Sequence, residues 1–161
     1  MFDEPGDILL APDCSVRVCD LALARTMREE VERVGGESSL AATPLSASPE
    51  QFRDPVLLDW RSDVYILGAT LYHMLAGRPL FVDGLDQKLT LIRMVRLIQS
   101  RAPDPIQGFC PDCPPDVAAL VHHTLAKDRR ERPQTADEVV SRLNQLRVEI
   151  AGRRQRVAPG D

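Results

Sequence analysis

The chain has 161 residues, of which 43% are hydrophobic and 27% are charged, and this is the composition of one ordinary globular domain. It disfavours disorder, collagen and coiled-coil architectures. Lys and Arg number 20 against 24 Asp and Glu, so the net charge of −4 argues against nucleic-acid binding through bulk positive charge. We expect the partners to be proteins or small molecules.

The first predicted element is a β-hairpin over residues 8–18, with a turn at Pro12 and Asp13 between two short apolar strands. Residues 21–48 follow as a long loop, because glycines and mixed charges replace any sustained apolar period there. A loop of this length in a compact domain is usually functional or disordered.

Four helices are predicted after the loop. Apolar residues at helical spacing place them over residues 62–75, 87–100 and 115–126, and from Thr135 onward. The first of these is apolar on nearly all sides, which predicts a central helix on which the others pack, and Gly77 with Pro79 predicts its end. Thr135 and Glu138 are spaced as a capping box, which predicts the start of the last helix.

The two ends of the chain predict its organisation and location. We expect one domain over residues 1–150 and a basic, flexible tail over residues 151–161. The longest charge-free stretch, Val64–Gly77, is shorter than the roughly 20 residues that a membrane-spanning helix needs, so no membrane span is predicted. The acidic start, Met1–Pro5, lacks the apolar core of a targeting signal, which predicts a cytoplasmic protein.

Five short motifs occur in a fixed order along the chain. They are Pro5–Leu10 (PGDILL), Cys19–Arg25 (CDLALAR), Ser48–Glu50 (SPE), Arg61–Gly68 (RSDVYILG) and Asp128–Pro133 (DRRERP). In this order they resemble the C-terminal lobe of a bacterial-type serine/threonine protein kinase, over about residues 2–148. The resemblance implies a mainly α (α+β) fold, in which a short β-hairpin precedes a helical bundle around one central buried helix. It also implies that residues 21–48 are an activation-segment-like loop.

The resemblance implies candidate positions for Mg-ATP. In the family, the Asp of the Asp-Phe-Gly segment and the Asn of the catalytic loop hold the magnesium ions, and here these positions are Asp20 and Asp7. Two carboxylates still offer the hard oxygens that Mg²⁺ prefers. Leu9 takes the position under the adenine ring. The alternative, which the sequence favours over metal binding, is a solvated hairpin mouth.

The position of the catalytic base departs from the family. That base lies five residues before the metal-binding Asn, and Phe2 occupies its place here. A phenyl ring accepts no proton, and Glu4 at the position of the catalytic-loop lysine would repel the transferred phosphate. Asp3 would serve only if the loop shifted by one residue. The glycine-rich loop and strand lysine of the N-terminal lobe have no counterpart in this sequence, so we expect no kinase activity from this chain alone.

The resemblance also implies two structural anchors. Glu50 and Arg132 are expected to form a buried ion pair between the end of the activation segment and the loop before the last helix. Removing one partner of such a pair typically costs about 3–5 kcal/mol. Asp63 is expected to accept backbone hydrogen bonds from the catalytic loop. Together these residues imply that the fold is retained.

The four cysteines form two spaced pairs, Cys14 with Cys19 and Cys110 with Cys113. Four thiolates can hold a structural zinc ion, but the resemblance places the two pairs far apart, which disfavours a zinc site. A cytoplasmic location disfavours disulfides.

Two classes of function remain. The first is a degenerate, pseudokinase-like lobe that acts as a protein-interaction or regulatory module. The second is a fragment or half of an ATP-dependent serine/threonine protein kinase that takes its N-lobe from elsewhere; a remnant without a role also stays open. The hairpin face that bears Leu9 would be an apolar patch if exposed. We therefore expect a protein partner on this face, self-association, or a locally mobile hairpin.

Overall fold

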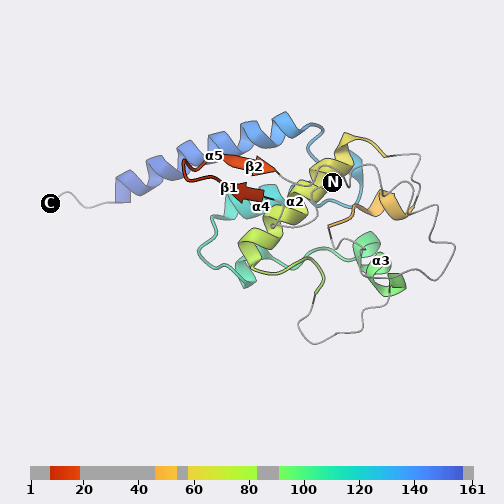
Figure 1. Cartoon of the computed structure of the whole chain (residues 1–161). Coiled ribbons are helices and arrows are strands. Elements are labelled where there is room, and N and C mark those ends of the chain that lie inside the picture. The colour runs from red at the N-terminus through yellow and green to blue at the C-terminus, as the bar shows by residue number, and fades with distance from the viewer. Residues whose placement is uncertain (1–7, 19–45, 54–57, 83–90, 158–161) are drawn as a thin grey trace.

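A computed structural model describes residues 8–18, 46–53, 58–82 and 91–157 of the chain. Within these ranges a two-stranded hairpin is followed by four α-helices and three short 3-10 helices. The elements are β1 (Ile8–Leu10), β2 (Val16–Val18), η4 (Pro49–Phe52), α2 (Trp60–Ala76), α3 (Leu91–Ser100), η6 (Ile106–Gly108), α4 (Pro115–Thr124), η7 (Arg129–Glu131) and α5 (Ala136–Val157). The mainly helical architecture predicted from the sequence is confirmed (Figure 1).

The hairpin has the predicted limits and turn. Its strands are antiparallel, and Leu10 pairs with Val16. The N–H of Cys14 donates to the carbonyl oxygen of Ala11 at 2.8 Å, and Cys14 adopts a left-handed conformation with φ of 63°. A tight turn followed by one left-handed residue is a common three-residue hairpin loop, because it matches the twist of the strands.

The central helix α2 begins and ends with strong local signals. The Asp59 side chain caps its first turn by accepting from the N–H of Arg61 at 2.9 Å. At the other end Gly77 takes a left-handed conformation with φ of 68°, and its N–H donates to the carbonyl oxygen of His73. Glycine adopts this conformation at no steric cost, which is why the predicted stop at Gly77 ends the helix.

The core lies where α2 meets α4 and the segments around it. Figure 1 shows α2 running through the middle of the helical part, with α5 along one edge. Gly68 allows a close approach of α2 to α4, since a Cβ atom there would lie 1.9 Å from Thr124 Oγ1. The largest fully buried side chains include Tyr65, Leu80, Ile98, Ile106, Val121, Leu125, Val139 and Leu146.

The helix limits differ from the predictions at several ends. The helix expected from residue 87 is described from Leu91, because residues 83–90 lie outside the described ranges. The capping box of α5 is only half formed: the N–H of Glu138 donates to Thr135 Oγ1, but the Glu138 carboxylate accepts from the N–H of Gln134. In addition, α5 continues to Val157, so the segment expected as a tail from residue 151 begins as helix.

Two ion pairs support the extension of α5. Arg153 pairs with Glu149 one turn earlier and with Asp116 of α4, and both contacts support the helix beyond residue 150.

Among the residues that the structure describes, none of the helices has the length and apolar character that crossing a bilayer requires.

Candidate functional site

The sequence-predicted site residues divide into two groups. Phe2, Asp7 and Asp20 lie outside the described residues, as does most of the loop predicted over residues 21–48. Leu9 lies on β1 with 51% of its surface exposed. Glu50, Asp63 and Arg132 are described, so the geometry below concerns the anchoring side of the site.

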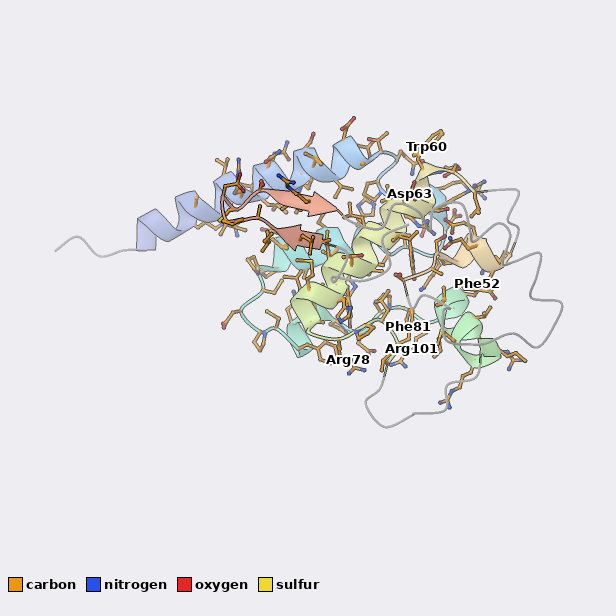
Figure 2. The ribbon with its side chains drawn as sticks, viewed as in Figure 1. Phe52, Trp60, Asp63, Arg78, Phe81 and Arg101 are labelled. Carbon is orange, nitrogen blue, oxygen red and sulfur yellow. The ribbon has the colours of Figure 1, made fainter. Side chains whose placement is uncertain are left out.

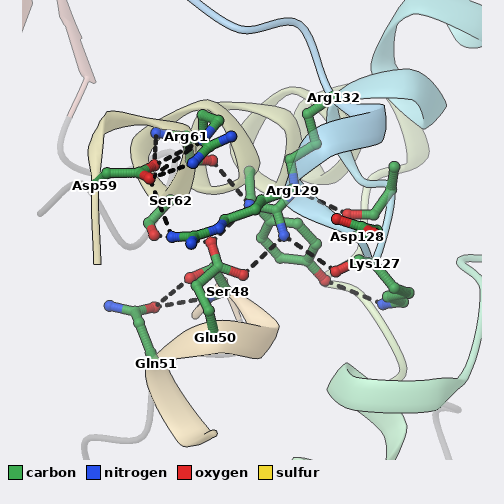
Figure 3. Close-up of polar contacts among 12 residues, drawn as sticks. Ser48, Glu50, Gln51, Asp59, Arg61, Ser62, Lys127, Asp128, Arg129 and Arg132 are labelled. Atoms are coloured by element: carbon green, nitrogen blue, oxygen red, sulfur yellow. Dashed lines mark hydrogen bonds and ion pairs between the residues drawn. The ribbon is translucent and has the colours of Figure 1, made fainter. Parts of the chain in front are cut away.

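Glu50 and Arg132 meet in a two-pronged ion pair (Figure 3). Arg132 Nη1 donates to Glu50 Oε1 at 2.7 Å, and Nη2 donates to Oε2 at 2.8 Å. The Arg132 side chain is fully buried and that of Glu50 is 11% exposed. Two parallel charge-assisted hydrogen bonds fix both orientation and distance, which lysine at this position would not do.

The remaining donors of Arg132 also have partners. Its Nε donates to the carbonyl oxygen of Ala126, and its Nη1 also donates to that of Arg61, each at 2.8 Å. Its guanidinium carbon lies 4.9 Å from the centre of the Tyr65 ring. A buried charge is stable only when its partners replace the lost hydration, and this arrangement meets that condition.

Glu50 is positioned by the short helix η4 and by α2. Ser62 Oγ of α2 donates to Glu50 Oε1 at 2.8 Å. Ser48 and Gln51 form a capping box at the start of η4, in which the N–H of Ser48 donates to Gln51 Oε1 at 2.6 Å. Burial alone raises the pKa of Glu50, but the hydrogen bonds and charge of Arg132 outweigh it, so the pKa lies below its usual range. We call Glu50, Ser62 and Arg132 the anchor network.

A second charged cluster, which sequence analysis missed, lies beside the anchor network. Asp59 accepts hydrogen bonds from the Arg61 guanidinium through both carboxylate oxygens, and its Oδ2 also accepts from Arg129 Nη1 at 3.0 Å. The hydrogen bonds from Arg61 lower the pKa of Asp59 to about 2. Trp60 Nε1 donates to the carbonyl oxygen of Gln134 at 2.7 Å and so ties the start of α2 to the segment before α5. The sequence signal was Asp59 itself, a capping residue directly before an apolar helix.

Lys127 is a further group that the sequence did not single out. Its Nζ donates to the Tyr65 hydroxyl at 3.2 Å and lies 4.7 Å from the centre of the Phe81 ring. No ion pair joins it to a carboxylate in the described part of the chain. Desolvation, followed by the charge of Arg132, lowers the pKa of Lys127 to about 8.

Asp63 lies in the first turns of α2, close to Trp60 (Figure 2). Its side chain is exposed, although partial desolvation and the nearby Asp59 carboxylate raise its pKa. The catalytic-loop backbone that was expected to donate to it belongs to residues 1–7, outside the described ranges. Its role therefore stays a prediction.

The cysteines and possible metal ligands are spread over the molecule. Cys14 is exposed in the hairpin turn, while Cys110 and Cys113 lie between η6 and α4, and Cys19 is outside the described residues. Within the described ranges, His, Cys, Asp and Glu side chains form no group of three or more that could hold a metal ion. For Mg²⁺, the carboxylates of Asp7 and Asp20 suit the ion by donor chemistry alone.

Comparison with known proteins agrees with this architecture. The profile of the protein kinase domain matches residues 4–143. Serine/threonine-protein kinase PknB of Mycolicibacterium smegmatis is 33% identical over 145 residues, which are 90% of this chain and 22% of the relative. The DNA damage-responsive serine/threonine-protein kinase RqkA of Deinococcus radiodurans is 32% identical over 131 residues, 81% of this chain and 19% of that protein.

A third relative, the probable serine/threonine-protein kinase PknB of Bifidobacterium longum, is 30% identical over 84% of this chain and 19% of its own length. The chain thus spans about a fifth of the curated relatives that it matches. The kinase-domain match covers most of the sequence, and the helical fold around α2 is of the kinase C-lobe type. The chain therefore belongs to the protein kinase family, with bacterial serine/threonine kinases among its relatives.

Proposed function

We propose that this chain is a noncatalytic serine/threonine kinase C-lobe that acts as a protein-interaction module. One observation carries the proposal: the contacts that hold the fold are present, while the resemblance aligns Phe2 with the catalytic base. A phenyl side chain accepts no proton and orients no hydroxyl group, so phosphoryl transfer loses a part that positioning cannot replace.

The anchor network supports a folded module. It joins η4, α2 and the loop before α5, three segments that are distant in sequence. In this proposal the ion pair of Glu50 and Arg132 holds the end of the activation segment against the helical core. An incompletely paired buried charge costs several kcal/mol. The complete set of hydrogen bonds around Arg132 therefore favours a chain that folds stably.

The hairpin supports an interaction role. Leu10 and Val16 pair across the two strands on one face and are 74% and 62% exposed, although both are large apolar residues. Leu9 is 51% exposed on the opposite face, where it pairs with Arg17, so the apolar face is that of Leu10 and Val16 and not the one expected to bear Leu9. Adjacent exposed apolar side chains are a common feature of protein–protein contact sites. We propose that the occupant is a protein that covers this face, or a second copy of the chain.

A second candidate is one part of an ATP-dependent serine/threonine kinase that requires an N-lobe from elsewhere. The observation that favours it is the pair of carboxylates at Asp7 and Asp20, since their donor chemistry suits Mg²⁺. The relatives named above are serine/threonine kinases several times longer than this chain. In that case Leu9 would lie under the adenine ring.

Thermal unfolding with and without Mg²⁺ and ATP separates the two candidates. A ligand at 100 times its Kd stabilises a protein by about 2.7 kcal/mol. At this chain length, each kcal/mol shifts Tm by about 2–4 °C. The noncatalytic proposal expects a cooperative transition whose Tm is the same with Mg-ATP, with Mg²⁺ alone and with buffer.

The Asp20→Asn variant is the control for this measurement. A magnesium-dependent increase in Tm that disappears in Asp20→Asn would support the second candidate and would contradict a module without a nucleotide site. An increase that persists in the variant would indicate ATP binding elsewhere on the chain, and would contradict the assignment of Asp20 to the metal.

A further inference from the structure

Cys110 and Cys113 lie at the two ends of one tight turn between η6 and α4. The N–H of Cys113 donates to the carbonyl oxygen of Cys110 at 3.1 Å, with Pro111 and Asp112 as the central residues. Such a turn holds its first and fourth Cα atoms within about 7 Å. A disulfide requires Cα atoms about 4.4–6.8 Å apart, and the separation that such a turn imposes is compatible with this range.

The two thiols have different surroundings. Cys113 is 4% exposed and belongs to the hydrophobic core, whereas Cys110 is partly exposed and packs against the edge of that core. Burial, and then the neighbouring Cys110, raise the pKa of Cys113. The partly exposed Cys110 thiol is therefore the one that a reagent can reach, and the buried Cys113 thiol is the one that can react afterwards with the modified Cys110.

The turn is held in place from both sides. The N–H of Cys110 donates to the carbonyl oxygen of Ile106 at 2.8 Å, and the N–H of Ile106 donates to His122 Nε2 of α4 at 3.4 Å. The guanidinium carbon of Arg78 lies 4.9 Å from the centre of the Phe109 ring. Because these contacts do not involve the sulfur atoms, the turn keeps its geometry while both thiols are reduced, and the two thiols have a high effective concentration.

We propose that Cys110 and Cys113 form a reversible dithiol–disulfide site that reacts with small-molecule disulfides. The Cys110 thiolate attacks one sulfur of the reagent, which releases the first reagent thiolate and leaves a mixed disulfide on Cys110. The Cys113 thiolate then attacks the Cys110 sulfur and releases the second reagent thiolate. Two electrons pass from the protein to the reagent, and the two protons of the protein thiols end on the released thiols.

This site is independent of nucleotide binding and of the hairpin face. A cytoplasmic location would be compatible with this site, because the disulfides of intracellular proteins are typically transient or redox-sensing. The ring closes within the turn that precedes α4, whose residues Ala118 and Val121 pack in the same core as Cys113. Oxidation therefore fixes the start of the helix that packs directly on α2.

The test uses the full chain in a Cys14→Ser/Cys19→Ser background, so that only Cys110 and Cys113 remain. The chain is equilibrated in glutathione buffers of increasing oxidised fraction and quenched with acid. The remaining free thiols are alkylated with a maleimide, and the intact mass of the chain is measured by mass spectrometry. We expect one product that is two hydrogens lighter than the reduced chain and carries no maleimide. Its equilibrium constant should exceed that of the same chain in denaturant by about tenfold or more, because the native turn preorganises the thiols.

Two results would overturn the proposal. One is a native chain that accumulates glutathione on Cys110 without ring closure; the other is an equilibrium constant no greater in the native than in the denatured chain. The Cys110→Ser variant tests the order of attack without a change in the core. Its remaining Cys113 should react with oxidised glutathione at least about tenfold more slowly in the folded chain than in denaturant, since burial excludes the reagent. Equal rates would contradict the assigned roles.

Discussion

The anchor network and the hairpin are opposite extremes of the same molecule. Arg132 is fully buried, and its charge is shared among a carboxylate, backbone carbonyl groups and an aromatic ring. From Leu9 to Arg17, by contrast, each hairpin side chain except that of Ala11 is exposed. Buried contacts between distant segments supply most of the stability of a domain, whereas a hairpin with an exposed apolar face adds little. We infer that the helical part folds without help from the hairpin.

The largest effect is expected from Arg132→Ala. The substitution leaves the Glu50 carboxylate buried with only Ser62 as a partner among the contacts described above. Loss of one member of a buried ion pair typically costs about 3–5 kcal/mol, so the free energy of unfolding in denaturant melts should fall by that amount.

Arg130→Ala is the matched control for that variant. Arg130 is two residues away and its side chain is 83% exposed, although it also pairs with a carboxylate, that of Asp128. An exposed ion pair contributes at most about 1 kcal/mol. Equal losses of stability in the two variants would contradict the role of the anchor network.

Gly68→Ala should rank second, because it tests the close approach of α2 and α4. A methyl group at residue 68 would lie 1.9 Å from Thr124 Oγ1 and 3.3 Å from Leu125 Cγ, so one helix must move. Overpacking of this kind typically costs about 1–3 kcal/mol. Gly152→Ala in α5 has open space around the new methyl group and should stabilise the chain by about 0.5–1 kcal/mol. A decrease in stability for both variants in chemical denaturation would mean that the contact with Thr124 is not the cause.

Lys127→Met should change how stability depends on pH. In the folded chain the pKa of Lys127 is lowered from 10.5 to about 8, so between these values the unfolded chain holds one more proton than the folded chain. The free energy of unfolding therefore gains up to about 1.4 kcal/mol per pH unit in this window from Lys127. Below pH 8 both states hold the proton, and the gain is absent.

The measurement for Lys127 is the difference between the original chain and the variant from pH 7 to 10. Cys113 and Tyr65 have raised pKa values and act in the opposite direction at alkaline pH. Because Tyr65 contacts Lys127 directly and an unfolded tyrosine ionises near pH 10, the comparison is made on the part of the curve between about pH 8 and 9.5. The stability of the original chain relative to Lys127→Met should rise above pH 8. A difference that stays constant with pH would show that Lys127 is not desolvated.

Local patterns predicted most of the fold, because helix periodicity, the Gly77 stop and the hairpin turn each depend on neighbouring residues. The contacts around Lys127 and Asp59 could not be predicted in this way. Lys127 meets Tyr65 and Phe81, which are distant in sequence, and no periodicity encodes such a meeting. The pairing of Glu50 with Arg132 was expected only from the family resemblance, since charge and spacing alone do not select a partner 82 residues away.

The smallest effect is expected in the hairpin, and Leu10→Ser tests the other extreme of the comparison. Leu10 is 74% exposed, so its removal takes little apolar area out of a buried environment, and the free energy of unfolding should change by less than about 0.5 kcal/mol. Hydrogen exchange should show early exchange of the backbone amides of residues 8–18 and late exchange of those in the middle of α2, because α2 is largely buried and the hairpin is exposed. If Leu10→Ser instead destabilised the monomer by more than 1 kcal/mol, or if residues 8–18 were as protected as α2 in the monomer, the hairpin would be part of the cooperative core. If it weakened only a concentration-dependent dimer in sedimentation experiments, the apolar face would be the contact between two copies of the chain.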